Sequence, residues 1–314
     1  MVEYSDEFVW AQKYRPRKID DVILPAPLKE TFKKFLEKGE LPNLMLSGGP
    51  GVGKTTVARA LLEELSADYI IINSSLEGNM DTLRNQIMNF ASTVSFKGGR
   101  KYVILDEADY LTSAVQPALR NFIETFSSNC GFILTANIPG RIMDALHSRW
   151  TEIEFKIAKK DAPELAGLFM KRVFDILDQE NVKYDKTAVV TVIQKYFPDW
   201  RRVLNELQRY AASGEINAGS ITNTGDFSID DLMKLIKAKK FTELRKWVGE
   251  NLDADSAVLF RRLYDNSNKY LEPSSVPQLI LIINDHQYKA QFAVDQEINI
   301  MGCLIEIMAN CVFK

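Results

Sequence analysis

The sequence predicts an α/β fold in its first half, with helices covering a parallel sheet, and helical domains in its second half. Three observations support this prediction. Five short apolar runs alternate with helical patterns over residues 1–157. A glycine-rich loop separates the first apolar run from the first helical pattern, and beyond residue 157 the strand signal fades. Strands that alternate with helices imply a parallel sheet with helices on both faces.

The strands and helices are expected at definite positions. The apolar runs that predict strands are Leu44–Leu46, Tyr69–Ile72, Tyr102–Leu105, Phe132–Leu134 and Ile153–Phe155. The stretches that predict helices are Lys54–Leu65, Asp81–Ala91, Ser113–Phe126, Arg141–Leu146, Asp161–Leu177, Thr187–Phe197 and Asp199–Ala212. The run Leu279–Ile283 is too short for its periodicity to distinguish a buried strand from a helix.

Three domains follow from these patterns. Residues 1–157 are expected to form the α/β domain, residues 158–225 a small helical domain, and residues 226–314 a second helical domain. The segment Ser213–Phe227 is rich in Gly, Ser, Thr and Asn, which predicts a linker between the two helical domains. The length of 314 residues agrees with two or three domains of ordinary size.

Composition and charge exclude several classes of protein. With 46% apolar and 26% charged residues, the chain has enough apolar surface for a folded core. The most apolar stretch, Ile298–Phe313, contains Glu306 and is too short to span a bilayer, and residues 1–10 show no secretory signal.

The net charge is −3, and no segment is strongly basic, so any surface for nucleic acid must be local or assembled from several copies. The three cysteines, at 130, 303 and 311, fit no metal or redox motif and are expected to be reduced thiols in a cytosolic protein.

The strongest motif is the loop GGPGVGKT at residues 48–55, which matches G-x-x-x-x-G-K-[ST] at every fixed position. It follows an apolar run and opens a helix, which is the context that a phosphate-binding loop requires. Glycines let backbone N–H groups turn toward phosphate oxygens, and the helix N-terminus adds a positive dipole. Lys54 is expected to reach the β- and γ-phosphates, and the Thr55 hydroxyl is expected to bind Mg²⁺. The loop residues predicted to contact nucleotide are Gly51, Val52, Gly53, Lys54, Thr55 and Thr56.

Polar side chains end two further strands. Asp106 and Glu107 follow the run 102–105, and Asn137 follows the run 132–134. Asp106 suits the Mg²⁺ shell, and Glu107 suits polarisation of an attacking water. Asn137 is expected to hydrogen-bond the γ-phosphate or that water, although an Asn at this position could simply cap the following turn. An acid directly after the metal-binding Asp favours a hydrolase over a small-molecule kinase.

Together these motifs resemble a known family. The segments WAQKYRP (10–16), GGPGVGKT (48–55), DEAD (106–109), TAN (135–137), SR (148–149) and DWRR (199–202) occur in the order seen in sliding-clamp-loader AAA+ ATPases. That family includes replication factor C small subunits, and the spacing looks most like the clamp-loader large subunit of T-even-like tailed phages. The resemblance covers nearly the whole chain and is most specific in the first 210 residues. Trp150 departs from it, because the family usually has Cys after Ser-Arg.

The resemblance implies a role for particular residues. The nucleotide would be ATP with Mg²⁺, and the base pocket would be formed by Ala11, Gln12, Lys13, Tyr14 and Ile23. Asn137 would be the sensor of the γ-phosphate, and Arg201 would be the cation of a helical lid. Arg149 would be an arginine finger that reaches the nucleotide of a neighbouring subunit, where such a residue can add 10³–10⁵ to the rate.

The resemblance also implies an assembly. Five subunits would form an open spiral through all-α collars built from residues 226–314, four of them copies of this chain and one a different subunit. ATP binding would stabilise an open sliding clamp, and hydrolysis would release the closed clamp on primer–template DNA during replication. Arg84 and Arg141 are candidate DNA contacts. The assembly would be cytoplasmic, in the bacterial host if the chain is encoded by a phage.

Three other functions fit part of the sequence. A AAA+ loader or motor for a helicase or for branched DNA would share every nucleotide-binding residue. A structural subunit that binds nucleotide without hydrolysing it would need neither Glu107 nor Arg149. A P-loop kinase for a small metabolite would leave the helical C-terminal third unexplained.

Overall fold

The computed structural model describes residues 8–75, 80–95, 98–113, 115–212, 214–217, 229–250, 256–290 and 292–314. The chain divides into two compact units, Met1–Ala218 and Gly219–Lys314. The predicted boundary at 157/158 lies inside the first unit and stays a prediction. The predicted boundary at 225/226 lies outside the described residues.

The first unit is built on a parallel sheet of five strands in the order β2-β3-β4-β1-β5. The strands are β1 (Leu44–Ser47), β2 (Tyr69–Asn73), β3 (Lys101–Asp106), β4 (Cys130–Ala136) and β5 (Thr151–Glu154). This confirms the predicted α/β fold and places each strand within two residues of its apolar run. Strand β4 lies between β1 and β3, so the ends of these three strands meet at one edge of the sheet.

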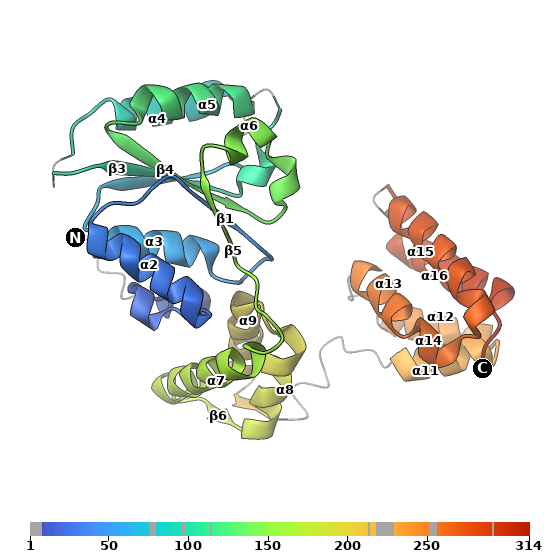
Figure 1. Cartoon of the computed structure of the whole chain (residues 1–314). Coiled ribbons are helices and arrows are strands. Elements are labelled where there is room, and N and C mark those ends of the chain that lie inside the picture. Colours follow the sequence, from blue (N-terminus) through green and yellow to red (C-terminus); the bar gives the residue numbers. More distant parts are fainter. Residues whose placement is uncertain are drawn as a thin grey trace. The chain divides into compact units, whose positions relative to one another are not determined.

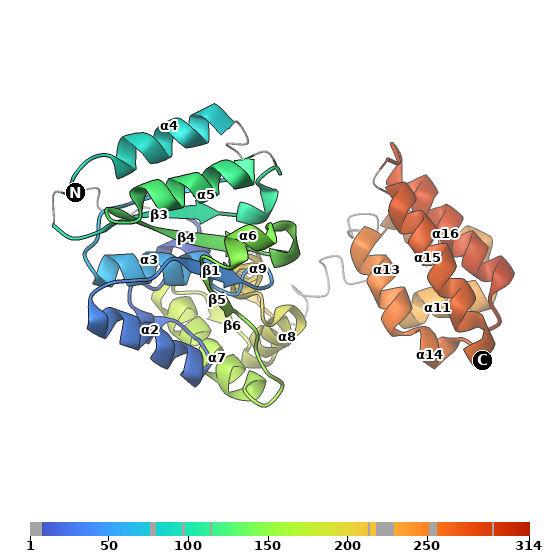
Figure 2. The ribbon, with the colours of Figure 1, turned by 45° about the horizontal axis from the view of Figure 1, so that its top comes forward.

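Helices cover both faces of this sheet (Figures 1 and 2). The α/β part contains α1 (Trp10–Lys13), α2 (Ala26–Lys38), α3 (Lys54–Glu64), α4 (Met80–Ala91), α5 (Val115–Phe126) and α6 (Asp144–His147), with short 3-10 turns at Ile19–Asp21, Ala108–Tyr110 and Pro139–Arg141. Helices α4 and α5 lie on one face, and α2 and α3 lie on the other. The alternation of β3 explains both cores, because Val103 and Leu105 pack toward α4 and α5, and Ile104 packs toward α2 and α3.

The helix predicted over Arg141–Leu146 is wrong at its start. Residues Pro139–Arg141 form a 3-10 turn, and α6 begins only at Asp144. The Gln116 side chain explains the interruption. Its Nε2 donates to the Arg141 carbonyl at 2.9 Å, and its Oε1 accepts from the Met143 N–H at 2.7 Å. These backbone groups therefore bond to a side chain instead of continuing a helix.

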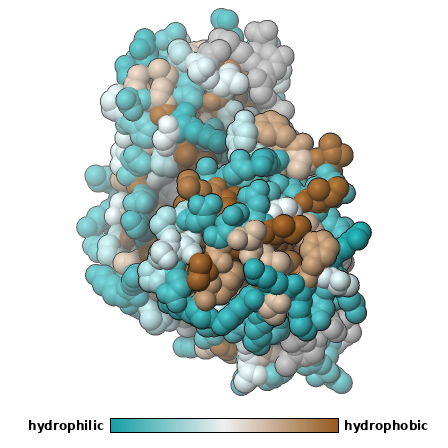
Figure 3. Space-filling model, turned by 90° about the vertical axis from the view of Figure 1, so that its right-hand side faces the viewer, coloured by the Kyte–Doolittle hydropathy of each residue, from teal (hydrophilic) through white to brown (hydrophobic). Residues whose placement is uncertain are grey.

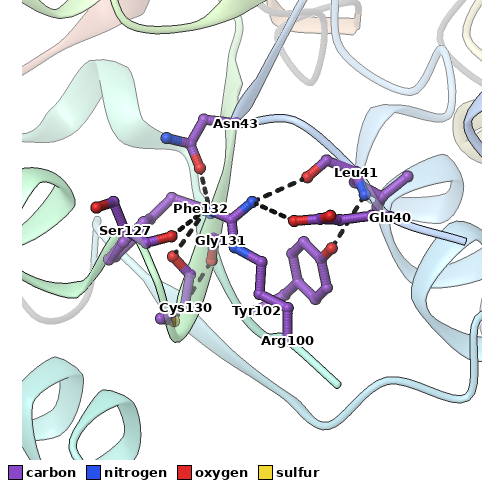
Figure 4. A network of polar contacts seen from close by, with 9 residues as sticks. All are labelled: Glu40, Leu41, Asn43, Arg100, Tyr102, Ser127, Cys130, Gly131 and Phe132. Atoms are coloured by element: carbon purple, nitrogen blue, oxygen red, sulfur yellow. Dashed lines mark hydrogen bonds and ion pairs between the residues drawn. The ribbon is translucent and has the colours of Figure 1, made fainter.

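A hydrogen-bonded network holds the amino ends of β3 and β4 (Figure 4). The half-buried guanidinium of Arg100 donates to the Leu41 carbonyl at 3.3 Å, to the Ser127 carbonyl at 2.9 Å and to the Cys130 carbonyl at 3.2 Å. The Tyr102 hydroxyl accepts from the Leu41 N–H at 3.0 Å. These contacts satisfy backbone groups of Leu41, which precedes β1, of Ser127, which precedes β4, and of Cys130, the first residue of β4, so they tie the start of β3 to both neighbouring segments.

Three further helices of the first unit form a lid next to the sheet. These are α7 (Ala162–Gln179), α8 (Lys186–Tyr196) and α9 (Trp200–Ala211). Asp185 and Asp199 cap α8 and α9, each accepting a backbone N–H from its helix. Strands β6 (Lys183–Tyr184) and β7 (Glu215–Ile216) form a small parallel sheet. Strand β7 corrects part of the predicted linker, while residues 213 and 218–227 of that segment lie outside the described residues.

The second unit is helical and has a core of its own. It contains α11 (Ile229–Lys237), α12 (Phe241–Glu250), α13 (Ser256–Asp265), α14 (Ser267–Tyr270), α15 (Val276–Ala290) and α16 (Gln296–Asn310), with a 3-10 turn at Pro273–Ser275. The run Leu279–Ile283 is therefore part of a helix. Leu232, Leu263 and Leu304 are among the fully buried residues at its centre. In the described part of the chain, no helix has the length and apolar character needed to cross a membrane.

Candidate functional site

The largest set of predicted site residues meets at the carboxyl edge of the sheet. The phosphate loop follows β1, Asp106 ends β3, and Asn137 follows β4. Since β4 pairs with both β1 and β3, Asn137 is placed between the loop and the acids. This position follows directly from the strand order.

Lys54 lies at the N-terminus of α3 and is 8% exposed. Its Nζ donates to the Gly48 carbonyl at 2.8 Å, to the Gly49 carbonyl at 2.7 Å and to Asn137 Oδ1 at 2.8 Å. Burial lowers the pKa of its ammonium from 10.5 to about 8, and the nearby Asp106 carboxylate opposes this shift. The described partners of Lys54 Nζ are all oxygen acceptors, as expected of a cation whose ligands are phosphate oxygens.

Thr55 and Asp106 form a pair of hard oxygen donors. Thr55 Oγ1 donates to Asp106 Oδ1 at 2.6 Å. Thr135 Oγ1 donates to the same carboxylate oxygen at 2.5 Å, which orients Asp106 toward α3. Hydroxyl and carboxylate oxygens are ligands that Mg²⁺ accepts, and this ion normally completes its shell with waters and phosphate oxygens. In the described ranges, no group of three or more His, Cys, Asp or Glu side chains could hold a metal alone. The residues therefore fit Mg²⁺ that arrives with nucleotide.

Glu107 leaves the strand in an unusual backbone conformation. Its φ is 56° and its ψ is 44°, in the left-handed region, and its N–H donates to Thr135 Oγ1 at 3.0 Å. This turn explains how two consecutive acids, which would point to opposite faces of a strand, both line one pocket. A non-glycine residue held there costs about 1–3 kcal/mol, which the surrounding structure must offset.

Asp109 positions the end of β4. It is 4% exposed, and its carboxylate accepts the N–H of Asn137 at 3.2 Å and the N–H of Ile138 at 3.3 Å. The sequence motif contains Asp109, but no role for it could be derived from the sequence, because the contact joins two segments that are 28 residues apart.

One pocket of about 190 Å³ collects most of the predicted residues. Those that line it are Ala11, Tyr14, Ile23, Gly51, Val52, Gly53, Lys54, Thr55, Thr56, Asp106, Glu107, Asn137 and Arg201. Its lining also includes residues for which the sequence predicted no role, which are Arg15, Pro16, Val22, Pro50, Thr135, Phe169, Arg172, Trp200 and Leu204. The second set comes mainly from the lid helices α7 and α9 and from the N-terminal segment. Of these elements, α7 shows no motif of its own, so only the fold reveals the place of Phe169 and Arg172.

The lid closely approaches the phosphate loop. A Cβ added to Gly51 would lie 1.7 Å from Asp199 Oδ1, so no other residue fits there without movement. Asp199 caps α9 through the Arg202 N–H at 2.9 Å, and Arg201 follows it in the first helical turn. The close contact between Gly51 and Asp199 therefore sets the position of Arg201 relative to the phosphate loop.

Some predicted residues lie outside the pocket lining. Gln12 and Lys13 do not line it, and Lys13 Nζ instead donates to Glu180 Oε1 at 2.6 Å. Arg84 on α4 and Arg141 after β4 are exposed and also lie outside it. Nothing in the structure tests the predicted DNA contacts.

Arg149 also lies outside the pocket of its own chain. Its guanidinium donates to Glu124 Oε1 through Nη2 at 2.8 Å and through Nε at 3.1 Å, and to the Ala145 carbonyl at 2.8 Å. The next residue, Trp150, is 7% exposed and packs edge-on against Phe132 with ring centroids 6.4 Å apart. The indole at this position therefore anchors the backbone that carries Arg149.

The loop, the paired oxygen donors and the strand order define a P-loop nucleoside triphosphatase. Comparison with known proteins makes this more specific. The AAA family, described as ATPases associated with various cellular activities, matches residues 44–159, and the AAA+ lid-domain family of the sliding-clamp-loader large subunit matches residues 165–222.

Full-length relatives agree. The sliding-clamp-loader large subunit of Enterobacteria phage T4 is 33% identical over 98% of this chain and 98% of its own length. A replication factor C small subunit of Sulfurisphaera tokodaii is 29% identical over 96% of each chain. Among solved structures, the Thermotoga maritima RuvB Holliday junction branch migration motor has a TM-score of 0.53 with 18% identity, over 75% of this chain and 85% of that one, which shows a shared fold. The chain belongs to the AAA+ ATPases of the sliding-clamp-loader family, and its activity is ATP hydrolysis in DNA replication.

Proposed function

We propose that this chain is the repeated ATPase subunit of a complex that opens a sliding clamp and loads it on primer–template DNA. The observation that carries the proposal is the convergence of Lys54, the Thr55–Asp106 pair and Asn137 in one pocket that a helical lid also lines. Such a pocket senses the terminal phosphate, and a lid next to it can convert nucleotide state into domain movement.

ATP and Mg²⁺ are the proposed cofactors. When bound, Mg²⁺ would neutralise phosphate charge, with Thr55 and Asp106 as its protein ligands. Lys54 would exchange its carbonyl partners for phosphate oxygens, and Asn137 would report on the γ-phosphate. Glu107 would hold the attacking water as a general base, and Arg201 would contact the phosphates from the lid.

The arginine finger is proposed to act between subunits. Arg149 is turned away from its own pocket by Glu124 and the Ala145 carbonyl, and its side chain is 34% exposed. Since Arg149 does not line the pocket of its own chain, it would complete the pocket of a neighbour, as in ATPases completed in trans. ATP would therefore bind at a junction between two chains.

The second unit supplies a surface for this assembly. Figure 3 shows apolar side chains gathered among hydrophilic ones on the face turned to the viewer. Leu281, Tyr288, Ile298 and Ile305 of α15 and α16 are all exposed, Leu281 by 64% and Ile298 by 70%. Surfaces of this kind mark interaction sites. We propose that this unit is the collar that joins four copies of this chain and one different subunit, with the assembly in the cytoplasm.

The test is ATP turnover measured stepwise. We expect slow hydrolysis by the chain alone, and stimulation only when the different subunit, a sliding clamp and primed DNA are added together. Branched DNA without a clamp serves as the competing substrate. Stimulation by branched DNA that exceeds stimulation by clamp and primed DNA would replace the loader assignment with a branched-DNA motor.

A further inference from the structure

The N-terminal segment forms one wall of the nucleotide pocket, yet side chains of the lid hold it in place. Ala11, Tyr14 and Ile23 of this segment line the pocket. Between them the chain runs through a turn and the 3-10 helix Ile19–Asp21, with little regular structure of its own. Such a wall keeps its shape only if other elements fix it.

Arg172 of α7 provides the first attachment. Its Nη2 donates to the Tyr14 carbonyl at 2.9 Å, and its Nη1 donates to the Asp21 carbonyl at 2.7 Å. One guanidinium thus closes both ends of the loop between these residues. The guanidinium is partly removed from water where it makes these contacts, and this burial lowers the pKa of Arg172. A planar fork of donors can reach two separate carbonyls at once, which a lysine ammonium does with a poorer geometry.

Two more lid side chains attach the same segment. Glu180, at the end of α7, accepts from Lys13 Nζ and from the Tyr14 hydroxyl, both at 2.6 Å. Gln208 of α9 accepts the Trp10 N–H at 2.9 Å and donates to the Phe8 carbonyl at 2.6 Å. The segment is therefore tied to the lid at three places.

We infer that Arg172 is a positioning residue for the nucleotide base. The pocket then has a phosphate half, formed mainly by the loop and strand ends of the sheet, and a base half, formed by the N-terminal segment that the lid holds through Arg172. This inference rests on the proposed ATP site and deepens it. Loss of Arg172 loosens the base wall and leaves the phosphate loop intact.

Two probes separate these halves in the full-length chain. ATP uses both halves, whereas inorganic tripolyphosphate uses only the phosphate half. For Arg172→Met, which keeps the apolar stem and removes the donors, we expect ATP affinity to fall about 10-fold, in line with the loss of two charge-assisted hydrogen bonds. Tripolyphosphate affinity should remain within about 2-fold, because no residue of the phosphate loop contacts Arg172 in the described hydrogen bonds.

Further measurements distinguish positioning from general damage. The ratio of ATP affinity to GTP affinity should move toward one in Arg172→Met, because a loosened wall discriminates bases less well. Arg172→Lys, which keeps the charge, should recover part of the ATP affinity. Lys171→Met, at an exposed cation on the same helix, is the matched control and should bind both probes like the unmodified chain.

Either of two results would overturn the inference. One is an unchanged ATP affinity in Arg172→Met, and the other is an equal loss of ATP and tripolyphosphate binding in both Arg172 variants. Both titrations use the chain without clamp or DNA. A failure of the loader proposal would therefore leave this result unaffected, and the reverse also holds.

Discussion

At the scale of single residues, Lys54 shows that burying a charged side chain in a binding site costs free energy. Its ammonium is buried among carbonyl and amide oxygens, and its pKa is about 8 because burial disfavours the charged form. Phosphate binding needs the charged form. Binding of ATP and protonation of Lys54 are therefore linked, and the linkage lies within reach of ordinary buffers.

The affinity for ATP is accordingly expected to depend on pH. With a pKa of about 8, Lys54 is mostly charged at pH 7 and mostly neutral at pH 9, so affinity should be nearly full at pH 7 and below and fall as the pH rises through 8. The decrease between pH 7 and pH 9 should be about 10-fold, because the charged fraction falls by that factor. Calorimetric titration with a slowly hydrolysed ATP analogue at fixed ionic strength measures this. An affinity that is level across the range would show that Lys54 keeps its charge in the free chain.

A substitution at Glu107 is predicted to change the rate of ATP hydrolysis and to leave ATP affinity unchanged. Glu107→Gln keeps the size of the side chain and removes the carboxylate proposed as the base that polarises water, so turnover should fall by about 10²–10⁴. ATP affinity should stay within about 2-fold, since that substitution removes no phosphate contact. Single-turnover hydrolysis and equilibrium binding measure the two quantities. Glu164→Gln, at an exposed acid on α7, is the control, and comparable turnover in the two variants would remove the proposed role of Glu107.

At the scale of elements, the network at the start of β3 and β4 shows how the sheet is fixed at the edge opposite the site. Gly131 lies against the ring of Tyr102, and a Cβ there would be 2.5 Å from the ring. The ring cannot move freely, because its hydroxyl accepts the Leu41 N–H and the guanidinium of Arg100 lies 6.0 Å from its centroid. The glycine is thus required by close packing.

Gly131→Ala is therefore expected to destabilise the chain. Overpacking of this kind costs about 1–3 kcal/mol of unfolding free energy. Gly140→Ala is the matched control, because a Cβ at that position meets no atom within 4 Å. Chemical denaturation followed by circular dichroism compares the two. Equal midpoints would mean that Tyr102 adjusts without cost.

The sequence predicts elements well where one local pattern dominates. Each strand of the five-stranded sheet begins or ends within two residues of its apolar run. Burial on both faces makes the runs of the central strands β1, β3 and β4 almost wholly apolar. It fails where a distant side chain intervenes. Gln116 interrupts the helix expected from Arg141, and β7 arises from pairing with β6 rather than from any pattern of its own.

The residues of the candidate site differ in the same way, because some belong to a local motif and others are placed only by long-range contacts. Lys54, Thr55 and Asp106 belong to a loop or strand end with a recognisable motif, and they meet in the structure. Arg172 lines the same pocket without any local signal, and Trp200 and Thr135 belong to motifs that gave them no role of their own, since their roles depend on contacts across long sequence separations. Lys13 was expected near the base, but its charge is paired with Glu180.

At the scale of the whole molecule, the central prediction is that active sites are shared between chains. Lys54→Ala and Arg149→Ala should each abolish most ATP hydrolysis. When the two variants are mixed in equal amounts before assembly, about one junction in four between copies should join an intact pocket to an intact finger, provided that Arg149 acts in trans. Some turnover should then return.

The mixing experiment has a clear negative result. If Arg149 acted within its own chain, every protein in the mixture would lack one essential group, and turnover would remain at the level of the single variants. The matched control mixes Lys54→Ala with Glu107→Gln, in which both defects lie in the pocket. That mixture should stay inactive, because an intact finger cannot repair a pocket that lacks its lysine or its base.

The three thiols noted in the sequence are all buried and free. Burial raises the pKa of Cys130 to about 11 and that of Cys303 to about 12, and it also raises the pKa of Cys311. Because only the thiolate is nucleophilic, none of them should react appreciably with a maleimide at neutral pH until the chain unfolds. A mass spectrum after labelling checks this, and rapid modification of the native chain would contradict it. Cysteines introduced on exposed helices could then carry fluorophores while the natural thiols stay in place, so that movement between the lid and the second unit could be followed in single molecules.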